Sequence, residues 1–401
     1  MKATTFSYVL PLPFKDLMVM KKVLTASAAL LATAAVYGDW TSEDGSLTLG
    51  GDIEINTDYV DIKKAKIHPK DTGVNDGGKI ADDSRFLLDV QWFTRRDERD
   101  YITAKAQPLI RTDGTFSVDD SYLALGQEKL WEFQIGRYEA MELFSMGKDT
   151  VAYIAAGADT LGQGVYYYKG HEGRGRRDKM GQARLAGETS NWDVEVSTAY
   201  GDAADMLAGS NDYLKAHNLQ GEFQSDDNSF VIRPAVKYTS DSGFFNISAG
   251  VEFDASRDKV HIMVVRGEDE ATRKELAEYD LSERVGGAIR TEFMIREDLP
   301  LRLSGAYQKL KDIWKVYHFN VNFEYKQFGL GLSLVKNDFD KENLEDTSSY
   351  MLYTAYTLPI MDFDNATLSL GASYSETDNA YGYKDNKEKT GAVRAQINYY
   401  F

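Results

Sequence analysis

Ionisable side chains recur in this sequence at every second position of short segments, between apolar residues. They include Asp52, Glu54, Arg85, Asp89, Arg233, Lys237, Glu252, Arg290, Glu292, Arg302, His318, Glu324 and Arg394. Such groups hydrogen-bond to hydroxyls and water, and together with aromatic faces they form sites for polar small molecules. Their chemistry predicts contact with hydrophilic solutes, although any one of them could serve only to keep a polar surface wet.

A second set of candidate residues surrounds one long connection, Glu139–Lys179. If the elements described below enclose a channel, its expected constriction consists of Glu139, Glu142, Asp149, Tyr153, Asp159, Arg137, Arg290 and Arg302. The connection is apolar in places and rich in Gly and Tyr, so we expect it to pack against an inner surface. Acids on it that face arginines would set up a transverse field, which orders water and favours dipolar solutes. In the alternative, it covers the mouth of the channel or forms a subunit contact.

The sequence shows no catalytic machinery. Its five histidines are scattered and none lies in a recognisable nucleophile motif: His68, His171, His217, His261 and His318. The chain has no Cys, no Cys- or His-rich metal motif and no Gly-Lys-Thr phosphate loop. We therefore predict a protein that is not an enzyme and that uses no cofactor and no metal.

The elements that carry these residues should be strands, because polar and apolar residues alternate with a period of two. In the clearest case, Thr390–Phe401, one face carries Val393, Ala395, Ile397, Tyr399 and Phe401, and the other Arg394, Gln396 and Asn398. Such a strand suits an outer-membrane barrel, where lipid covers one face and a watery lumen the other. The final Phe401 resembles the C-terminal assembly signal of Gram-negative outer-membrane proteins.

Seventeen segments alternate in this way: Leu47–Tyr59, Phe86–Trp92, Tyr101–Leu109, Thr115–Gly126, Trp131–Arg137, Met180–Gly187, Trp192–Tyr200, Leu214–Gln224, Phe230–Tyr238, Phe245–Phe253, Val285–Ile295, Leu301–Tyr307, Tyr317–Tyr325, Phe328–Leu334, Tyr350–Leu358, Leu368–Tyr374 and Thr390–Phe401. Short and long connections alternate between them, except around residues 254–284. A further strand at Lys259–Arg266 restores the alternation and gives eighteen, an even number, as closure of an antiparallel barrel requires. Sixteen strands are the alternative, if two weak segments pair differently.

The predicted fold is all-β: a closed antiparallel transmembrane β-barrel with an inward-folded third extracellular loop. In lipid every backbone N–H and C=O must be paired, so strands can span only as a closed ring. A soluble sandwich or propeller would also use short alternating strands. It would not explain the Tyr and Trp residues at strand ends, such as Trp92, Trp192 and Tyr325, which favour the lipid headgroup layer.

Residues 1–38 are expected to be a leader and residues 39–401 the barrel. Lys21 and Lys22 precede an apolar run of about 14 residues, Val23–Val36, which is too short to span a bilayer. We read residues 20–38 as a signal peptide, with cleavage after Ala34 or Gly38. Export by this route, together with the predicted barrel, predicts a multi-pass protein in the outer membrane of a Gram-negative bacterium, in contact with lipid.

The chain is acidic, with a formal net charge of −17 over 401 residues. Removal of residues 1–38, which hold four Lys and one Asp, lowers this charge to −20. Such acidity argues against nucleic acid as a partner.

Three short motifs resemble a known family. Val118–Leu123 (VDDSYL), Ile135–Ala140 (IGRYEA) and Glu142–Phe144 (ELF) resemble the strand-four, strand-five and third-loop region of bacterial porins. The continuation Ser145–Thr150 (SMGKDT) is most similar to the raffinose-type glycoporins, which are carbohydrate porins. The resemblance implies a homotrimeric channel for sugars and ions. A general porin for small hydrophilic solutes and a non-conducting structural or adhesion barrel remain the alternatives.

Overall fold

The computed structural model describes residues 39–63, 77–97, 99–143, 180–202, 221–224, 228–255, 259–264, 274–280, 284–311, 314–340 and 344–401. Sixteen antiparallel strands form the wall: β2 (Leu47–Lys63), β4 (Arg85–Arg95), β5 (Asp100–Arg111), β6 (Phe116–Gln127), β7 (Trp131–Arg137), β8 (Met180–Glu188), β9 (Trp192–Asp202), β11 (Asn228–Thr239), β12 (Phe245–Asp254), β15 (Val285–Arg296), β16 (Leu299–Leu310), β17 (Trp314–Tyr325), β18 (Phe328–Phe339), β19 (Thr347–Ile360), β20 (Phe363–Asp378) and β21 (Glu388–Tyr400). Two short strands, β1 (Trp40–Thr41) and β3 (Gly77–Ala81), pair with β2 and bring this sheet to eighteen strands. A 3₁₀ turn, Ala380–Gly382, precedes β21. The leader predicted at residues 1–38 lies outside the described residues.

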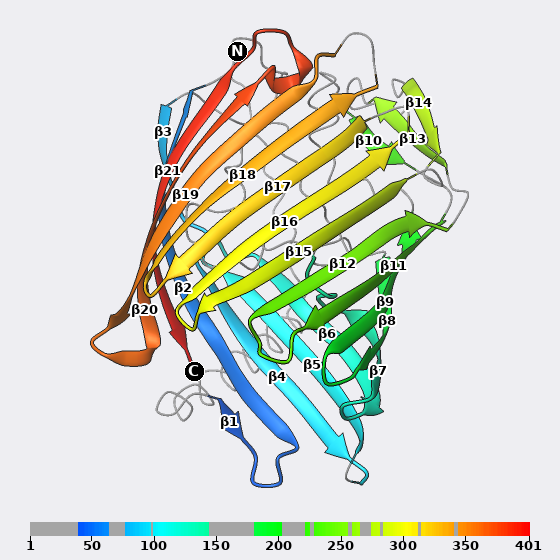
Figure 1. Cartoon of the computed structure of the whole chain (residues 1–401), viewed down its shortest axis with the longest axis vertical. Coiled ribbons are helices and arrows are strands. Elements are labelled where there is room, and N and C mark those ends of the chain that lie inside the picture. The colour runs from blue at the N-terminus through cyan, green and yellow to red at the C-terminus, as the bar shows by residue number, and fades with distance from the viewer. Residues whose placement is uncertain are drawn as a thin grey trace, which may run out of the picture.

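The barrel closes between the first and last wall strands. Each wall strand pairs with its neighbour in the chain, and β21 pairs with β2 from Asp52↔Tyr400 to Lys63↔Lys389. Figure 1 shows the red end of the chain beside the blue strand β2. Closure leaves no free edge in the wall, so every strand has a hydrogen-bonding partner on both sides.

The two predicted strand counts, eighteen and sixteen, describe different parts of the structure. The main sheet has eighteen strands, which is the predicted number, but two of them, β1 and β3, are not among the predicted segments. The wall itself has sixteen strands, which was the alternative. All sixteen wall strands were predicted from their alternation.

The role predicted for Lys259–Arg266 as a wall strand is wrong. The segment does form a strand, β13 (Lys259–Val264), but it pairs with β14 (Lys274–Asp280) and β10 (Gly221–Gln224) in a separate sheet. Meanwhile β12 pairs directly with β15, and β9 with β11, which leaves no position in the wall for either predicted extra strand. The prediction of Leu214–Gln224 as a wall strand is therefore also wrong. Leaving this segment out of the wall restores the alternation of the connections, just as adding Lys259–Arg266 would have done.

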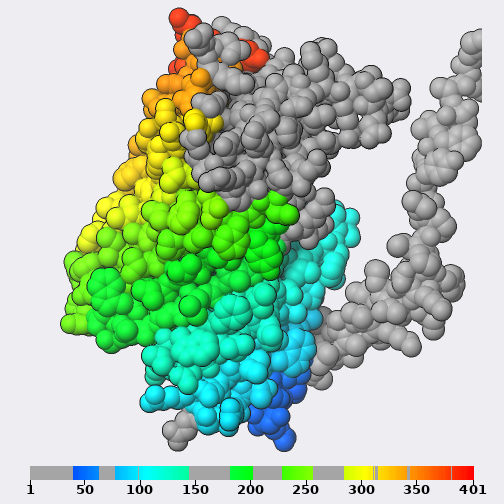
Figure 2. All heavy atoms as spheres, turned by 90° about the vertical axis from the view of Figure 1, so that its right-hand side faces the viewer, coloured from blue at the N-terminus to red at the C-terminus, as the bar shows by residue number. Residues whose placement is uncertain are grey.

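The two faces of the wall differ in polarity as the alternation predicts. In β17, His318, Asn320 and Asn322 are buried on the inner face, while Tyr317 and Phe319 are each 44% exposed on the outer face. Figure 2 shows the outer surface of successive strands, in order from blue to yellow. An outer face this rich in exposed apolar side chains requires lipid rather than water around it. In the described part of the chain, no helix is long and apolar enough to cross a membrane.

The two ends of the barrel carry different connections. At the end where β21 stops, here called the turn end, the connections have two to five residues: 96–99, 128–130, 189–191, 240–244, 297–298, 326–327 and 361–362. At the opposite, loop end, the first three connections are 64–84, 112–115 and 138–179. The connection predicted to fold inward is therefore the third loop at that end.

Phe401 lies at the turn end and is only 4% exposed. Its ring stacks on Phe86 with centroids 5.8 Å apart, and its backbone exchanges two hydrogen bonds with Gly51, of 2.9 and 3.1 Å. A Cβ at Gly51 would lie 2.9 Å from the Phe401 ring, so glycine makes this close approach possible. The packing ties the C-terminal residue to the first wall strand, and the role of Phe401 as an assembly signal stays a prediction.

Candidate functional site

The first residues of the third loop, residues 138–143, lie against the inner wall, and we call them the loop base. Leu143 is fully buried and packs against Ala235 of β11 and Ala288 of β15. The wall is built from small residues at this point. A Cβ added at Gly250 of β12 would lie 2.6 Å from the Leu143 Cδ1 atom. These small residues form a socket that only a glycine at position 250 leaves open.

Two buried charged residues of the wall hold the backbone of Met141. Both carboxylate oxygens of Glu195, on β9, accept from the Met141 N–H, at 3.0 and 3.1 Å. Arg233, on β11, donates from Nη2 to the Met141 carbonyl at 2.6 Å, and its Nη1 lies 3.5 Å from Glu195. The side chains of Glu195 and Arg233 are each 3% exposed. One peptide segment of the loop base is thus held through both its donor and its acceptor.

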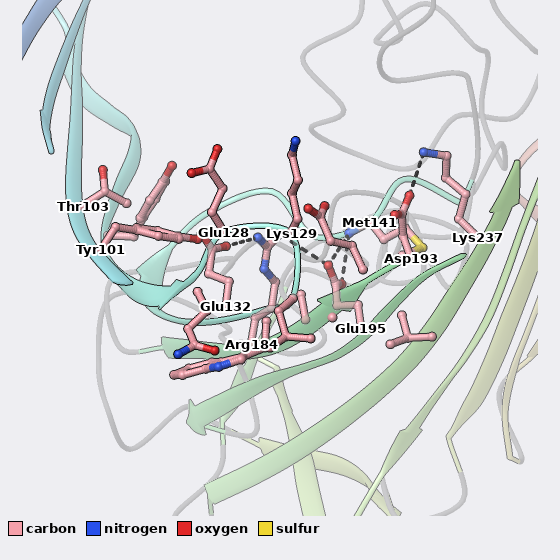
Figure 3. Close-up of a pocket in the computed structure, with 18 of the residues that line it drawn as sticks. Tyr101, Thr103, Glu128, Lys129, Glu132, Met141, Arg184, Asp193, Glu195 and Lys237 are labelled. Atoms are coloured by element: carbon pink, nitrogen blue, oxygen red, sulfur yellow. Dashed lines mark hydrogen bonds and ion pairs between the residues drawn. The ribbon is translucent and has the colours of Figure 1, made fainter. Parts of the chain in front are cut away.

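The polar contacts continue along the inner wall on the β8 side of this clamp. Arg184, on β8, bridges two carboxylates, with Nη2 at 2.5 Å from Glu132 and Nη1 at 3.4 Å from Glu195. Tyr101, on β5, donates its hydroxyl to the other oxygen of Glu132 at 2.8 Å. Figure 3 shows Arg184 lying between Glu132 and Glu195, with Met141 above Glu195. Hydrogen bonds therefore connect the wall from β5 to β11 beneath the loop base.

A second row of charges extends from the loop base in the opposite direction, and we call it the ionic row. Glu142 pairs with Arg290 of β15 at 3.2 Å, and Arg290 lies 3.4 Å from Glu292. Arg302, on β16, then bridges Glu292 at 2.5 Å and Glu324 of β17 at 3.1 Å. Three acids alternate with two arginines, so the row has many hydrogen-bonding groups and little net charge.

A separate polar cluster joins the two strands that close the barrel. Arg394, on β21, forms two 2.6 Å hydrogen bonds with Asp58 of β2 and a 3.0 Å contact with Asp83. In the adjoining segment outside the strands, hydrogen bonds from the Ser84 side chain and backbone lower the pKa of Asp82. The cluster strengthens the closing seam on its inner face.

The structure brings some of the predicted constriction residues together and not others. Glu142, Arg290 and Arg302 share the ionic row, as the predicted pairing of loop acids with wall arginines requires. Arg137 instead donates from Nε to the carbonyls of Val118 and Asp119 on β6, at 3.1 and 2.7 Å. Glu139 lies half-buried in the loop base. Asp149, Tyr153 and Asp159 lie outside the described residues, so the inward course of the rest of the loop stays a prediction.

Sequence reasoning missed three residues that anchor or extend this site: Glu132, Arg184 and Glu195. All three lie in strands that were predicted. Each is two positions away from a buried polar residue of the same strand, and so on the same face: Gln134, Gln182 and Ser197, respectively. That parity places them on the inner face. It does not say which of the many inner polar residues meets the loop base, because that depends on contacts across about fifty residues of chain.

Comparisons with known proteins agree with this architecture. A family model described as porin-like glycoporin RafY matches residues 49–401. Among solved structures, the outer membrane channel DcaP of Acinetobacter baumannii has 13% identity and a TM-score of 0.52, and the match covers 91% of this chain and 100% of that one. A loop-deletion variant of OmpT, an outer membrane protein of Vibrio cholerae, has 12% identity and a TM-score of 0.52, with 89% and 99% covered. A mutant of the Rh. blastica porin has 10% identity and a TM-score of 0.50, with 88% and 100% covered.

No curated protein gave a significant sequence match. At these identities the solved structures show the fold alone. The family model, in contrast, covers the wall from Leu49, the third residue of β2, to Phe401. The chain therefore belongs to the porin-like glycoporin family and is a multi-pass β-barrel of the outer membrane.

Proposed function

We propose that this protein is a passive diffusion channel for small hydrophilic solutes, that its preferred solutes are oligosaccharides, and that it has no catalytic role. The observation that best supports this proposal is the ionic row beside the loop base, on the inner face of a closed barrel. Paired carboxylates and guanidinium groups offer donors and acceptors that can replace the water around sugar hydroxyls. A homotrimeric assembly, ion passage and export by a signal peptide belong to the same proposal, which the family resemblance supports.

Liposome swelling tests this proposal. Vesicles that contain the purified protein should swell in isotonic raffinose or maltotriose and stay unchanged in a large dextran. A general porin would instead pass amino acids and sugars at rates set by size alone. If the vesicles do not swell in any small solute, the protein is a non-conducting barrel and the proposal is wrong.

Loss of an arginine from the ionic row should make the channel more selective for cations. In an Arg302→Gln variant, Glu292 and Glu324 lose their shared counter-charge and add negative potential to the lumen. Arg290→Gln should act in the same direction through Glu142 and Glu292. The reversal potential across a KCl gradient measures the change.

Lys315→Gln is the matched control for this prediction. Lys315 carries the same charge and also pairs with an acid, Asp340, at 3.1 Å. It alternates with the inner-face residues Val316 and His318 and so lies on the outer side near the loop end. An unchanged reversal potential in both arginine variants would show that the ionic row does not face the conducting path.

A further inference from the structure

A cavity of about 660 Å³ lies between the loop base and the turn end of the barrel. We call it the exit chamber. It is lined by residues of β4 to β9, β11, β12 and β15, by Met141 and Glu142 of the loop base, and by the turn residues Glu128 and Lys129. Figure 3 shows these turn residues and the wall residue Lys237 around the same space. Its size is in the range of about 300–1,000 Å³ that is usual for small-molecule sites.

One side of the exit chamber carries aromatic rings beside polar residues of the inner wall. Phe93 of β4 and Tyr101 of β5 stack at 5.7 Å between centroids with an interplanar angle of 21°. The Arg95 guanidinium lies over the Phe93 ring at 5.5 Å, and Tyr122 of β6 also lines the cavity. Aromatic faces in a water-filled lumen offer an apolar contact to a solute that has an apolar side of its own. The C–H face of a pyranose ring is such a surface.

Most of the charges around the exit chamber are arranged in pairs. Arg95 contacts Glu128 at 2.8 Å, and Lys237 contacts Asp193 at 2.9 Å. Arg184 and Arg290 pair with acids as described above. Six acidic and five basic residues are among the described lining residues, so the chamber is close to electrically balanced. Paired charges can exchange hydrogen bonds with hydroxyl groups, but they give no strong net attraction to an ion of either sign.

We propose that the exit chamber is a binding site for a neutral oligosaccharide. One sugar ring lies on the Phe93–Tyr101 stack, and its hydroxyls bond to the pairs formed by Arg184 with Glu132 and Glu195. This inference rests on the proposed function. It adds a site formed by wall and turn residues, on the turn-end side of the loop base, and a preference for uncharged sugars.

The test is the block of single-channel current by raffinose, by maltotriose and by a sugar acid of similar size. Tyr101→Ala and Phe93→Ala should each raise the half-blocking concentration of the neutral sugars by about three- to tenfold, which is the scale of one lost ring contact. Tyr101→Phe keeps the ring and loses the bond to Glu132, so its effect should be smaller than that of Tyr101→Ala. The sugar acid should block more weakly than either neutral sugar.

Tyr317→Ala is the control, because it removes an equal ring from the outer face. If an alanine variant does not assemble, Tyr101→Leu and Phe93→Leu keep the bulk while removing the aromatic face. Unchanged block by the neutral sugars in the ring variants overturns the inference and leaves the channel function intact. Equal block by the sugar acid overturns the preference for neutral solutes. If no sugar blocks the wild-type channel, the sugar part of the proposed function is wrong as well.

Discussion

An Arg233→Met variant is expected to show much larger open-channel current fluctuations than the wild type. Arg233 donates to the Met141 carbonyl and is also a counter-charge for Glu195, whose carboxylate holds the Met141 N–H. Removing one partner of a buried charged network costs about 3 kcal/mol. Arg184 also lies near Glu195 and should offset part of this cost. Because each 1.4 kcal/mol is about a tenfold change in population, the loop base should leave the wall far more often. Current noise in single-channel records measures this directly.

Two further variants separate the clamp from a general loss of stability. Lys237→Met removes a cation from the same face of β11, but its partner Asp193 is half-exposed, so open-channel noise should stay low. Adding Glu195→Gln to Arg233→Met removes the buried carboxylate that has lost one of its two arginine partners and should recover part of the lost stability. If Arg233→Met assembles normally and its open-channel noise equals that of the wild type, then Glu195 and Arg233 do not fix the position of the loop base.

Trimming the third loop between Ser145 and Gly162, with the loop base kept, should raise single-channel conductance and weaken any sugar block. A narrow neck dominates the resistance of a pore, so widening it acts on conductance more than a change at the mouth does. The motive is the loop base itself, which the clamp and the Leu143 socket direct along the inner wall. Single-channel recording with and without raffinose measures both effects.

A comparable shortening within residues 203–220, another connection at the loop end, is the control and should change conductance little. If trimming the third loop leaves conductance and block unchanged, its outer part lies outside the channel. The selectivity predicted for Asp149, Tyr153 and Asp159 would then be wrong.

The wall could be predicted from the sequence because its signal is local. A strand between lipid and water must alternate, and β17 or β21 shows that alternation without reference to any other segment. Which strands belong to the wall is not local. Lys259–Val264 is a strand like the others, and only its pairing with β14 and β10 sets it apart. Parity and loop length do not carry that information.

The candidate site divides in the same way. Glu142 was predicted as an acid of the third loop and Arg290 from the parity of its strand, but their contact joins residues 148 positions apart in the chain. Glu195 is one polar residue among many on the inner face, and nothing in its neighbours distinguishes it from Ser197. Its role arises because Met141 meets it, which depends on where the loop turns after β7. Contacts of this kind become visible only when the closed barrel is in place.

Planar-bilayer recording of the purified wild-type protein, with raffinose added stepwise, tests whether this barrel encloses a channel that accepts sugars. We expect discrete conductance steps whose current falls with raffinose concentration until the effect saturates, because the sugar occupies sites along the lumen. Discrete steps that raffinose does not block, or no conductance at all, would contradict this expectation.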